Sequence, residues 1–171
     1  MVAPVQIRAA TPADAADLAD VYRHHVLHGT ATFEEEPPGA AEMAARLEGV
    51  QANGWPWLVA HTDGIVAGYA YARQLNERAG YRYSCENSIY IRHDHVGRGI
   101  GTALLVALID AAMGCGFRRM FAVIGDSANL ASRVLHSRQG FSDAGTLREA
   151  GFKFGRPIDV VYMQRTLMEF P

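Results

Sequence analysis

The feature that most constrains this chain is a glycine-rich junction, HVGRGIG, at residues 95–101. It lies between a β-branched run, SIYI, and an apolar run with the pattern of a helix that begins at Thr102. A tight turn from a strand into a helix needs glycines where φ is positive or where the backbone approaches a ligand closely. The helix that follows presents unpaired N–H groups and the positive end of its dipole. The junction therefore predicts an anion site, and three spaced glycines around Arg98 favour a phosphate.

Two common nucleotide motifs are absent from the sequence. A P-loop requires Gly-Lys-Ser or Gly-Lys-Thr, and neither tripeptide occurs. A dinucleotide-binding fold requires G-x-G-x-x-G in its first β-α-β unit, whereas Gly97-x-Gly99 comes late in the chain and is followed by Thr102. The interpretation that remains is a pyrophosphate held by backbone amides in the second half of a small mixed domain.

The hydrophobic pattern predicts seven strands and four helices. Strands are expected at residues 5–10, 57–61, 65–72, 81–91, 117–125, 142–148 and 158–167, and helices at residues 12–28, 40–51, 102–114 and 129–139. A mixed sheet covered by helices is an α/β or α+β domain. A chain of 171 residues is long enough for one substantial core, so we expect residues 1–171 to form a single domain.

Composition excludes several classes of partner and compartment. The net charge is -2 with the basic residues scattered, which gives no electrostatic reason to expect a nucleic acid or a membrane surface as partner. Cys85 and Cys115 form no C-x-x-C pair, which favours a reducing cytoplasm. The N-terminal residues have no signal-peptide pattern, and no long apolar run predicts a membrane span.

The segment SIYIRHDHVGRGIGTALL resembles the acetyl-CoA motif of the GNAT N-acetyltransferases, Gln/Arg-x-x-Gly-x-Gly/Ala between a strand and a helix. The match runs from Val96 to Gly101, with Val96 where Gln or Arg is usual. Six further blocks in order are similar to the phosphinothricin and methionine sulfoximine acetyltransferases: ATFEEEPP, WLVAHTDGIVAGYAYA, CENSIYI, AVIGDSANLAS, LHSRQGF and GFKFGRPIDVVYMQ. The resemblance implies a GNAT fold, a mixed sheet of about six to seven strands flanked by about four helices. It also implies acetyl-CoA as co-substrate, an amino-acid-like acceptor and a homodimer.

Acetyl transfer to an amine requires a base, because an amine is mostly protonated near neutral pH. Glu86 is the candidate, since it interrupts an otherwise apolar strand and matches the family position for a base. A backbone N–H between Ile89 and Ile91 could stabilise the developing oxyanion if the sheet splays there. Cys85 has no evident base, so we expect direct transfer in a ternary complex rather than an acyl-enzyme. By resemblance, the residues that would bind the cofactor are Ile89, Tyr90, Ile91, Gly97, Arg98, Gly99, Ile100, Gly101, Thr102, Asn129 and Ser132.

The last predicted helix carries two further candidates. His136 occupies the place where many relatives have a tyrosine that protonates the leaving thiolate, and it is equally typical of a surface histidine near a helix C-terminus. Asn129 is a good N-cap, and the resemblance adds a contact with the cofactor arm.

An anionic amino acid as acceptor needs positive charge and an apolar wall. The predicted substrate-binding residues are Phe33, Asn76, Arg78, Tyr81, Arg82 and Glu86. Asn76 stands where relatives carry Lys or Arg, and Pro157 where Trp is common, so the exact substrate stays open. A protein N-terminus, a lysine, a polyamine or a non-catalytic acetyl-CoA-binding role are the alternatives.

No metal site is predicted from the sequence. His24 and His28 are spaced as an i, i+4 pair on the first predicted helix, but no third ligand is near in sequence and H-E-x-x-H is absent. With His25, they are interpreted as solvated residues of the helix's last turn.

Overall fold

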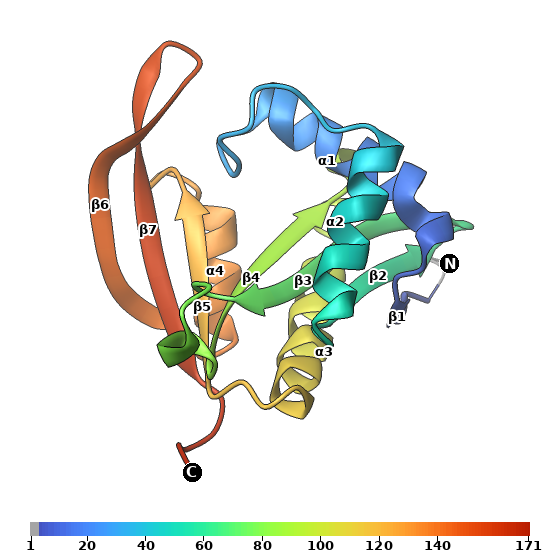
Figure 1. Cartoon of the computed structure of the whole chain (residues 1–171). Helices are drawn as coiled ribbons and strands as arrows, with labels where there is room; N and C mark the ends of the chain where they lie inside the picture. The colour runs from blue at the N-terminus through green and yellow to red at the C-terminus, as the bar shows by residue number, and fades with distance from the viewer. Residues whose placement is uncertain (1–3) are drawn as a thin grey trace.

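The computed structural model describes residues 4–171 as one seven-stranded sheet with helices on both faces (Figure 1). The strands are β1 (Gln6–Ala9), β2 (Trp57–Thr62), β3 (Ile65–Gln74), β4 (Ser84–Ile91), β5 (Arg119–Gly125), β6 (Ser142–Lys153) and β7 (Arg156–Thr166). The α-helices are α1 (Ala15–His28), α2 (Ala40–Ala52), α3 (Ile100–Gly114) and α4 (Leu130–Arg138). Short 3-10 turns occur at Pro12–Asp14, Ala79–Tyr81 and His93–His95.

The sheet has the order β1-β2-β3-β4-β5-β7-β6. Every neighbouring pair is antiparallel except β4 and β5, which are parallel and are joined through α3. The predicted mixed sheet covered by helices is confirmed.

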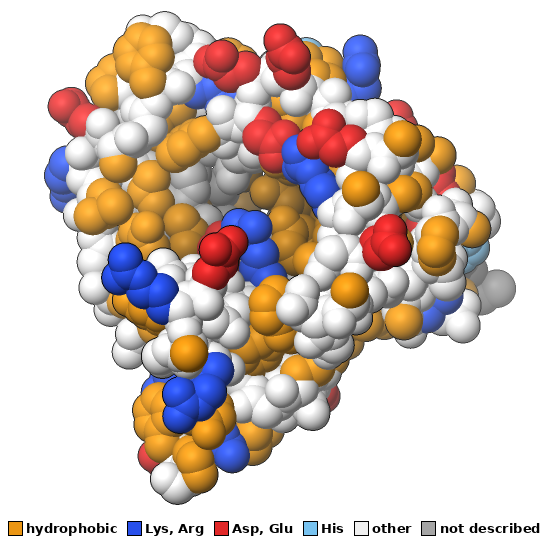
Figure 2. Space-filling model, in the orientation of Figure 1, with side chains coloured by type: hydrophobic (Ala, Val, Ile, Leu, Met, Phe, Trp, Pro, Cys, Tyr) orange, Lys and Arg blue, Asp and Glu red, His pale blue; other side chains and the backbone are white. Residues whose placement is uncertain are grey.

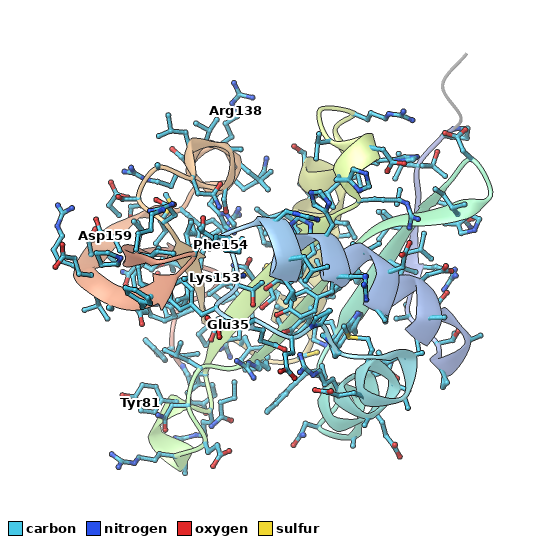
Figure 3. The ribbon with its side chains drawn as sticks, turned by 90° about the horizontal axis from the view of Figure 1, so that it is seen from above. Glu35, Tyr81, Arg138, Lys153, Phe154 and Asp159 are labelled. Carbon is cyan, nitrogen blue, oxygen red and sulfur yellow. The ribbon has the colours of Figure 1, made fainter. Side chains whose placement is uncertain are left out.

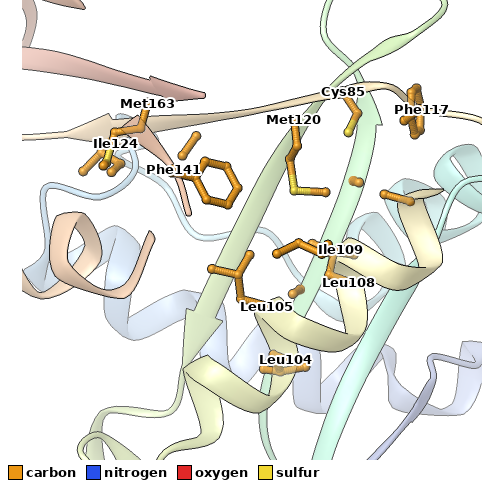
Figure 4. Close-up of a cluster of buried hydrophobic side chains, with 14 of the residues drawn as sticks. Cys85, Leu104, Leu105, Leu108, Ile109, Phe117, Met120, Ile124, Phe141 and Met163 are labelled. Carbon is orange, nitrogen blue, oxygen red and sulfur yellow. The ribbon is translucent and has the colours of Figure 1, made fainter. Parts of the chain in front are cut away.

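Two apolar clusters hold the helices against opposite faces of the sheet. One joins α1 and α2 to β2 and β3 through residues such as Leu18, Leu47 and Val59. The other joins α3 to the strands through Leu104, Leu108 and Met120 (Figure 4). Leu135 of α4 packs against this second cluster, so α3 and α4 share a face. Burial of each of these leucine side chains stabilises the fold by roughly 1.5–3 kcal/mol.

β4 and β5 separate part of the way along their length. Their pairing runs only from Ser84 with Arg119 to Asn87 with Ala122, whereas β3 stays paired with β4 as far as Ile91. The last half of β4 therefore has a free edge toward β5. This separation of β4 and β5 is the splaying of the sheet that a free backbone donor between Ile89 and Ile91 requires.

Two strand boundaries differ from the sequence-based prediction by three residues or more. β4 begins at Ser84 rather than at residue 81, because Ala79–Tyr81 forms a 3-10 turn. β6 extends to Lys153, beyond the predicted end at residue 148, and pairs with β7 in a long hairpin that projects from the sheet in Figure 1. Alternation failed to show this extension because residues 142–150 are exposed on both faces and pair with β7 in an irregular register.

Within residues 4–171, no helix is long and apolar enough to cross a membrane.

Candidate active site

A cavity of about 880 Å³ opens where β4 and β5 separate. Its wall combines β4, the end of β5, α4, the loop after α1, and aromatic side chains from β2 and β3. Figure 2 shows this face of the molecule hollowed between the β6–β7 hairpin and the side that carries α1 and α2, with charged side chains at the rim. Of the predicted site residues, it brings together Phe33, Glu86, Ile89, Tyr90, Asn129, Ser132 and His136.

Glu86 lies in the cavity wall with its side chain 21% exposed. Its oxygen Oε2 is 3.9 Å from Nη2 of Arg73, which lies directly opposite it in the β3–β4 register. Burial raises the pKa of Glu86, and the Arg73 cation opposes this rise only in part. A carboxylate with a raised pKa in a cavity is suited to take a proton from an amine near neutral pH.

The free edge of β4 points backbone groups into the gap. The amide of Arg92 donates to the carbonyl of Ala67 on β3, so strand alternation turns the amides of Ile89 and Ile91 to the opposite edge, toward β5. The carbonyl of Ile91 also faces that edge and accepts a hydrogen bond from Nε2 of His25 at 2.8 Å. The edge thus offers amide donors to an extended ligand arm placed beside it.

The glycine-rich junction has the predicted backbone. Gly97 and Gly99 have φ of 77° and 78°, and Gly99 is the N-cap of α3, which begins at Ile100. A Cβ on Gly101 would lie 3.3 Å from Cδ2 of Leu135, so this glycine allows α4 to approach α3 closely. Because Gly99 has no side chain to cap the helix, the first amides of α3 are directed to an exposed surface that suits an anion. Val96, where the family has a polar side chain, is 63% exposed.

Asn129 is the predicted N-cap of α4. Its Oδ1 accepts from the amide of Ser132 at 3.2 Å, and both residues line the cavity.

His136 is buried rather than on the helix surface, with 2% of the residue exposed. Nδ1 donates to the carbonyl of Ser132 at 2.8 Å, and Nε2 lies 3.0 Å from Oδ1 of Asn87. The Asn87 amide is oriented by its own donation from Nδ2 to the carbonyl of Phe121. Both ring nitrogens thus face oxygen acceptors, while burial lowers the pKa of His136. The interpretation of His136 as a surface histidine is therefore wrong.

The loop between α1 and α2 forms the wall opposite α4. Phe33 lines the cavity and is 39% exposed. Glu34 anchors the loop, because it accepts two hydrogen bonds from Arg46, at 2.7 and 3.0 Å, and one from the Tyr22 hydroxyl at 2.9 Å. The same hydroxyl lies 2.6 Å from Oγ1 of Thr32.

Four predicted substrate-binding residues lie away from this cavity. Asn76, Arg78, Tyr81 and Arg82 belong to the segment between β3 and β4, and none of them is in the cavity wall. Oδ1 of Asn76 accepts from the Arg78 amide at 3.0 Å, and Tyr81 is 42% exposed at the far end of this segment (Figure 3). The cofactor candidates Ile91, Gly97, Arg98, Gly99, Ile100, Gly101 and Thr102 also lie outside the wall, where β4 leads into α3.

Sequence reasoning missed Arg73 and Asn87. Each lines the cavity, and each contacts a predicted catalytic side chain. The register of the β2–β3–β4 meander was the available signal for Arg73, since it places Arg73 opposite Glu86.

Two of the three histidines of α1 are not simply solvated, whereas His28 is exposed. His25 is half-buried through its bond to Ile91, and the ring of His24 stacks on that of His93 with centroids 4.3 Å apart. No group of three or more His, Cys, Asp or Glu in the described chain is placed to hold a metal ion.

Comparison with known proteins places this site in a family. Residues 7–162 match the model of the acetyltransferase (GNAT) domain. The chain is 47% identical to a phosphinothricin N-acetyltransferase of Alcaligenes faecalis, over 94% of this chain and 82% of that one. It is 39% identical to an L-methionine sulfoximine/L-methionine sulfone acetyltransferase of Salmonella typhimurium, over 95% of each chain.

Among solved structures, an acetyltransferase of Salmonella typhimurium with its cofactor acetyl-CoA superposes with a TM-score of 0.95 at 38% identity. The superposition covers 98% of this chain and 96% of that one. The predicted resemblance is therefore confirmed, and the chain belongs to the GNAT acetyltransferases, in the phosphinothricin and methionine sulfoximine acetyltransferase branch, as an acetyl-CoA-dependent N-acetyltransferase.

Proposed function

We propose that this enzyme transfers the acetyl group of acetyl-CoA to the α-amine of a small amino acid of the phosphinothricin, methionine sulfoximine or methionine sulfone type. The observation that carries the proposal is the pair formed by Arg73 and Glu86, whose charged atoms are 3.9 Å apart in one cavity. An α-amino acid carries its carboxylate and its amine on the same carbon, so Arg73 can bind the first while Glu86 faces the second. A lysine side chain or a polyamine has no carboxylate beside its amine. The names of the relatives support the same acceptor class.

Arg73 replaces Arg78 and Arg82 as our candidate for binding the acceptor carboxylate. Among the described residues, the arginines in the cavity wall are Arg73 and Arg46. Arg46 is engaged by both oxygens of Glu34, whereas the Arg73 side chain is 54% exposed and has its carboxylate partner only at 3.9 Å. Arg73 is therefore the lining cation that is better placed to pair with a ligand.

The residues along β4 and α3 fit coenzyme A. The free-edge amides of Ile89 and Ile91 suit the amides of a pantetheine arm, with Tyr90 between them in the cavity wall. The first amides of α3, from Ile100 to Thr102, with the backbone of Gly97 to Gly99, would hold the pyrophosphate, and the exposed Arg98 would add a positive charge. Asn129 and Ser132 would meet the arm from α4. When bound, acetyl-CoA supplies a thioester whose carbonyl carbon accepts the amine.

The residues of the cavity then divide the proton transfers. The Glu86 carboxylate takes a proton from the acceptor ammonium, and the freed amine attacks the carbonyl carbon, forming the C–N bond as the C–S bond breaks. The amide of Ile89 donates to the carbonyl oxygen as its negative charge develops. His136 gives a proton to the departing thiolate, directly or through a water, and regains one from the attacking nitrogen, which loses its second proton as the amide forms. The doubly protonated ring satisfies the oxygen acceptors at both ring nitrogens, although burial lowers its pKa.

Thiol release from acetyl-CoA tests the proposal. The purified enzyme should turn over with phosphinothricin, methionine sulfoximine or methionine sulfone, and it should not acetylate a diamine of similar length. Turnover with a polyamine or a peptide amine alone would favour the alternative acceptors, and acetyl-CoA binding without any turnover would favour a binding module.

Glu86→Gln is the matched test of the base. It keeps the shape of the side chain and removes its basicity, so kcat should fall by about 100-fold or more while the Kd for acetyl-CoA stays within about twofold. An unchanged kcat would remove Glu86 from this role.

We also propose a homodimer, in which the exposed edge of the sheet is one surface available for contact. Leu147 and Phe152 on β6 and Phe154 directly after it are 51%, 67% and 55% exposed, and exposed apolar side chains at a sheet edge are typical of a surface that another chain covers. Sedimentation equilibrium should give twice the mass of one chain, and a monomer at all concentrations would contradict the proposal. The free thiols of Cys85 and Cys115 support a reducing compartment such as the cytoplasm.

A further inference from the structure

The wall of the cavity that carries Phe33 is held by the β6–β7 hairpin. Residues 31–34, in the loop between α1 and α2, form this wall, and the hairpin lies across from the loop in Figure 1. Phe33 is the aromatic residue of this loop that lines the cavity, so the position of its ring sets how much room an acceptor side chain has.

Lys153, at the end of β6, fastens the backbone of this loop. The residue is 1% exposed, which is exceptional for a lysine. Its ammonium Nζ donates to the carbonyl of Gly29 at 2.9 Å and to that of Thr32 at 2.8 Å. Figure 3 shows Lys153 on the hairpin, with Glu35 close to it. These two bonds join residues that are 124 and 121 positions apart, and they fix the loop on either side of residues 30 and 31.

Gly151, on the same face of β6 as Lys153, receives the ring of Phe33. A Cβ built on Gly151 would lie 2.4 Å from Cε2 and Cζ of Phe33, far inside van der Waals contact. The Phe33 ring therefore packs directly against the backbone of Gly151. At Gly125 the loop is equally close, since a Cβ there would lie 2.2 Å from the carbonyl oxygen of Thr30. The loop is therefore already in close contact with the end of β5 and cannot move closer to it.

We propose that Lys153 and Gly151 are positioning residues for the acceptor: they set the place of the Phe33 ring, and through it the size of side chain that the acceptor part of the cavity admits. This inference rests on the proposed function, because it concerns the acceptor of that reaction. A methyl group added at Gly151 must displace the ring, and because the ring lines the cavity, its displacement changes the shape of the cavity. Loss of the Lys153 ammonium leaves two loop carbonyls without their donor and loosens the same ring.

The test is a comparison of steady-state constants for Gly151→Ala, Phe33→Leu and the double variant. Gly151→Ala should raise the KM for methionine sulfone at least tenfold, with kcat within about threefold and the KM for acetyl-CoA unchanged. Phe33→Leu placed in the Gly151→Ala background should return the KM to within about threefold of wild type, because leucine lacks the ring atoms that meet the new methyl group. A KM that stays unchanged in Gly151→Ala, or that the second substitution does not restore, would overturn the inference.

Lys153→Met supplies an independent arm should Gly151→Ala fail to fold. It keeps the length of the side chain without its charge and should raise the KM for the acceptor while leaving that for acetyl-CoA in place. Equal changes in both constants, or a lower Tm with unchanged constants, would show a merely structural role and overturn the inference. A wild-type enzyme that acetylates none of these amino acids would instead contradict the proposed function, so the two failures are distinguishable.

Discussion

The pair of Arg73 and Glu86 predicts a measurable change in the pH dependence of the reaction. Two unit charges 3.9 Å apart attract by about 1 kcal/mol in bulk water and by about 4 kcal/mol at an effective dielectric constant of about 20. Because the Arg73 side chain is 54% exposed, solvent screens the pair and the lower figure applies. An attraction of about 1 kcal/mol corresponds to a change of about 0.7 in a pKa.

Arg73→Gln removes the cation that opposes the burial of Glu86. The pKa of Glu86 is already raised, and it should rise further, so a larger share of the base is protonated at a given pH. The acid limb of kcat/KM should therefore move to higher pH, by about 0.5 to 1 pH unit. Since kcat/KM reports on the free enzyme, no acceptor carboxylate offsets the Arg73 charge in this measurement. The KM for the acceptor should rise about 10- to 100-fold, because its carboxylate loses a charged partner.

The assay is thiol release with saturating acetyl-CoA across the pH range, for wild type, Arg73→Gln, Arg73→Lys and Arg82→Gln. Arg73→Lys keeps the charge and should leave the acid limb in place. Arg82→Gln changes an arginine outside the cavity and should alter neither the limb nor the KM. An acid limb that stays fixed or moves downward in Arg73→Gln would refute the electrostatic reasoning. If the KM for the acceptor rises in Arg82→Gln and not in Arg73→Gln, Arg82 would again be the candidate for binding the acceptor carboxylate.

Three other sites give sharp expectations. Asp14 has its pKa lowered to about 2, chiefly by the Arg8 guanidinium, so Asp14→Asn should cost about 1–2 kcal/mol of unfolding free energy at pH 7. That difference in unfolding free energy should shrink as the pH falls from about 4 toward 2. Urea unfolding in which the two proteins differ as much at low pH as at pH 7 would contradict a lowered pKa at Asp14. Gly99→Ala places a side chain at a φ of 78° and should both destabilise the fold by about 1–2 kcal/mol and weaken acetyl-CoA binding in calorimetry. Gly114→Ala, at the last residue of α3 and with open space around it, should not destabilise the fold and should leave acetyl-CoA binding unchanged. His136→Asn should slow kcat about 3- to 10-fold at acid pH, where the wild-type ring carries a proton to give. Because burial lowers the pKa of His136, the difference in kcat should shrink as the pH rises through that pKa, and a pH-independent difference would argue against proton donation.

The backbone of the glycine-rich junction and the start of α4 could be predicted from the sequence because their signals are local. Gly97 and Gly99 adopt positive φ within one turn of chain, and Asn129 caps a helix three residues ahead of its partner Ser132. The sequence placed a strand directly before the glycines but left the free edge of β4 as a condition, which the short pairing of β4 with β5 meets. His136 was found by its place in a helix, but its burial could not be, because that depends on Asn87, 49 residues away.

The proposed acceptor side depends on contacts between distant parts of the chain, and this is why its residues differ from those predicted from the sequence. Arg78 and Arg82 are near Glu86 in sequence, but the 3-10 turn at Ala79–Tyr81 takes them off the strand, while Arg73 reaches Glu86 across the β3–β4 pairing. Lys153 and Gly151 meet the loop after α1 only when β6 has paired with β7. Such contacts leave no periodicity in the sequence. A substitution in the hairpin can therefore change the choice of acceptor while the cofactor motif, which lies on β4 and α3, keeps its geometry. Acceptor selectivity in this chain should accordingly vary with residues whose contacts no local pattern reveals.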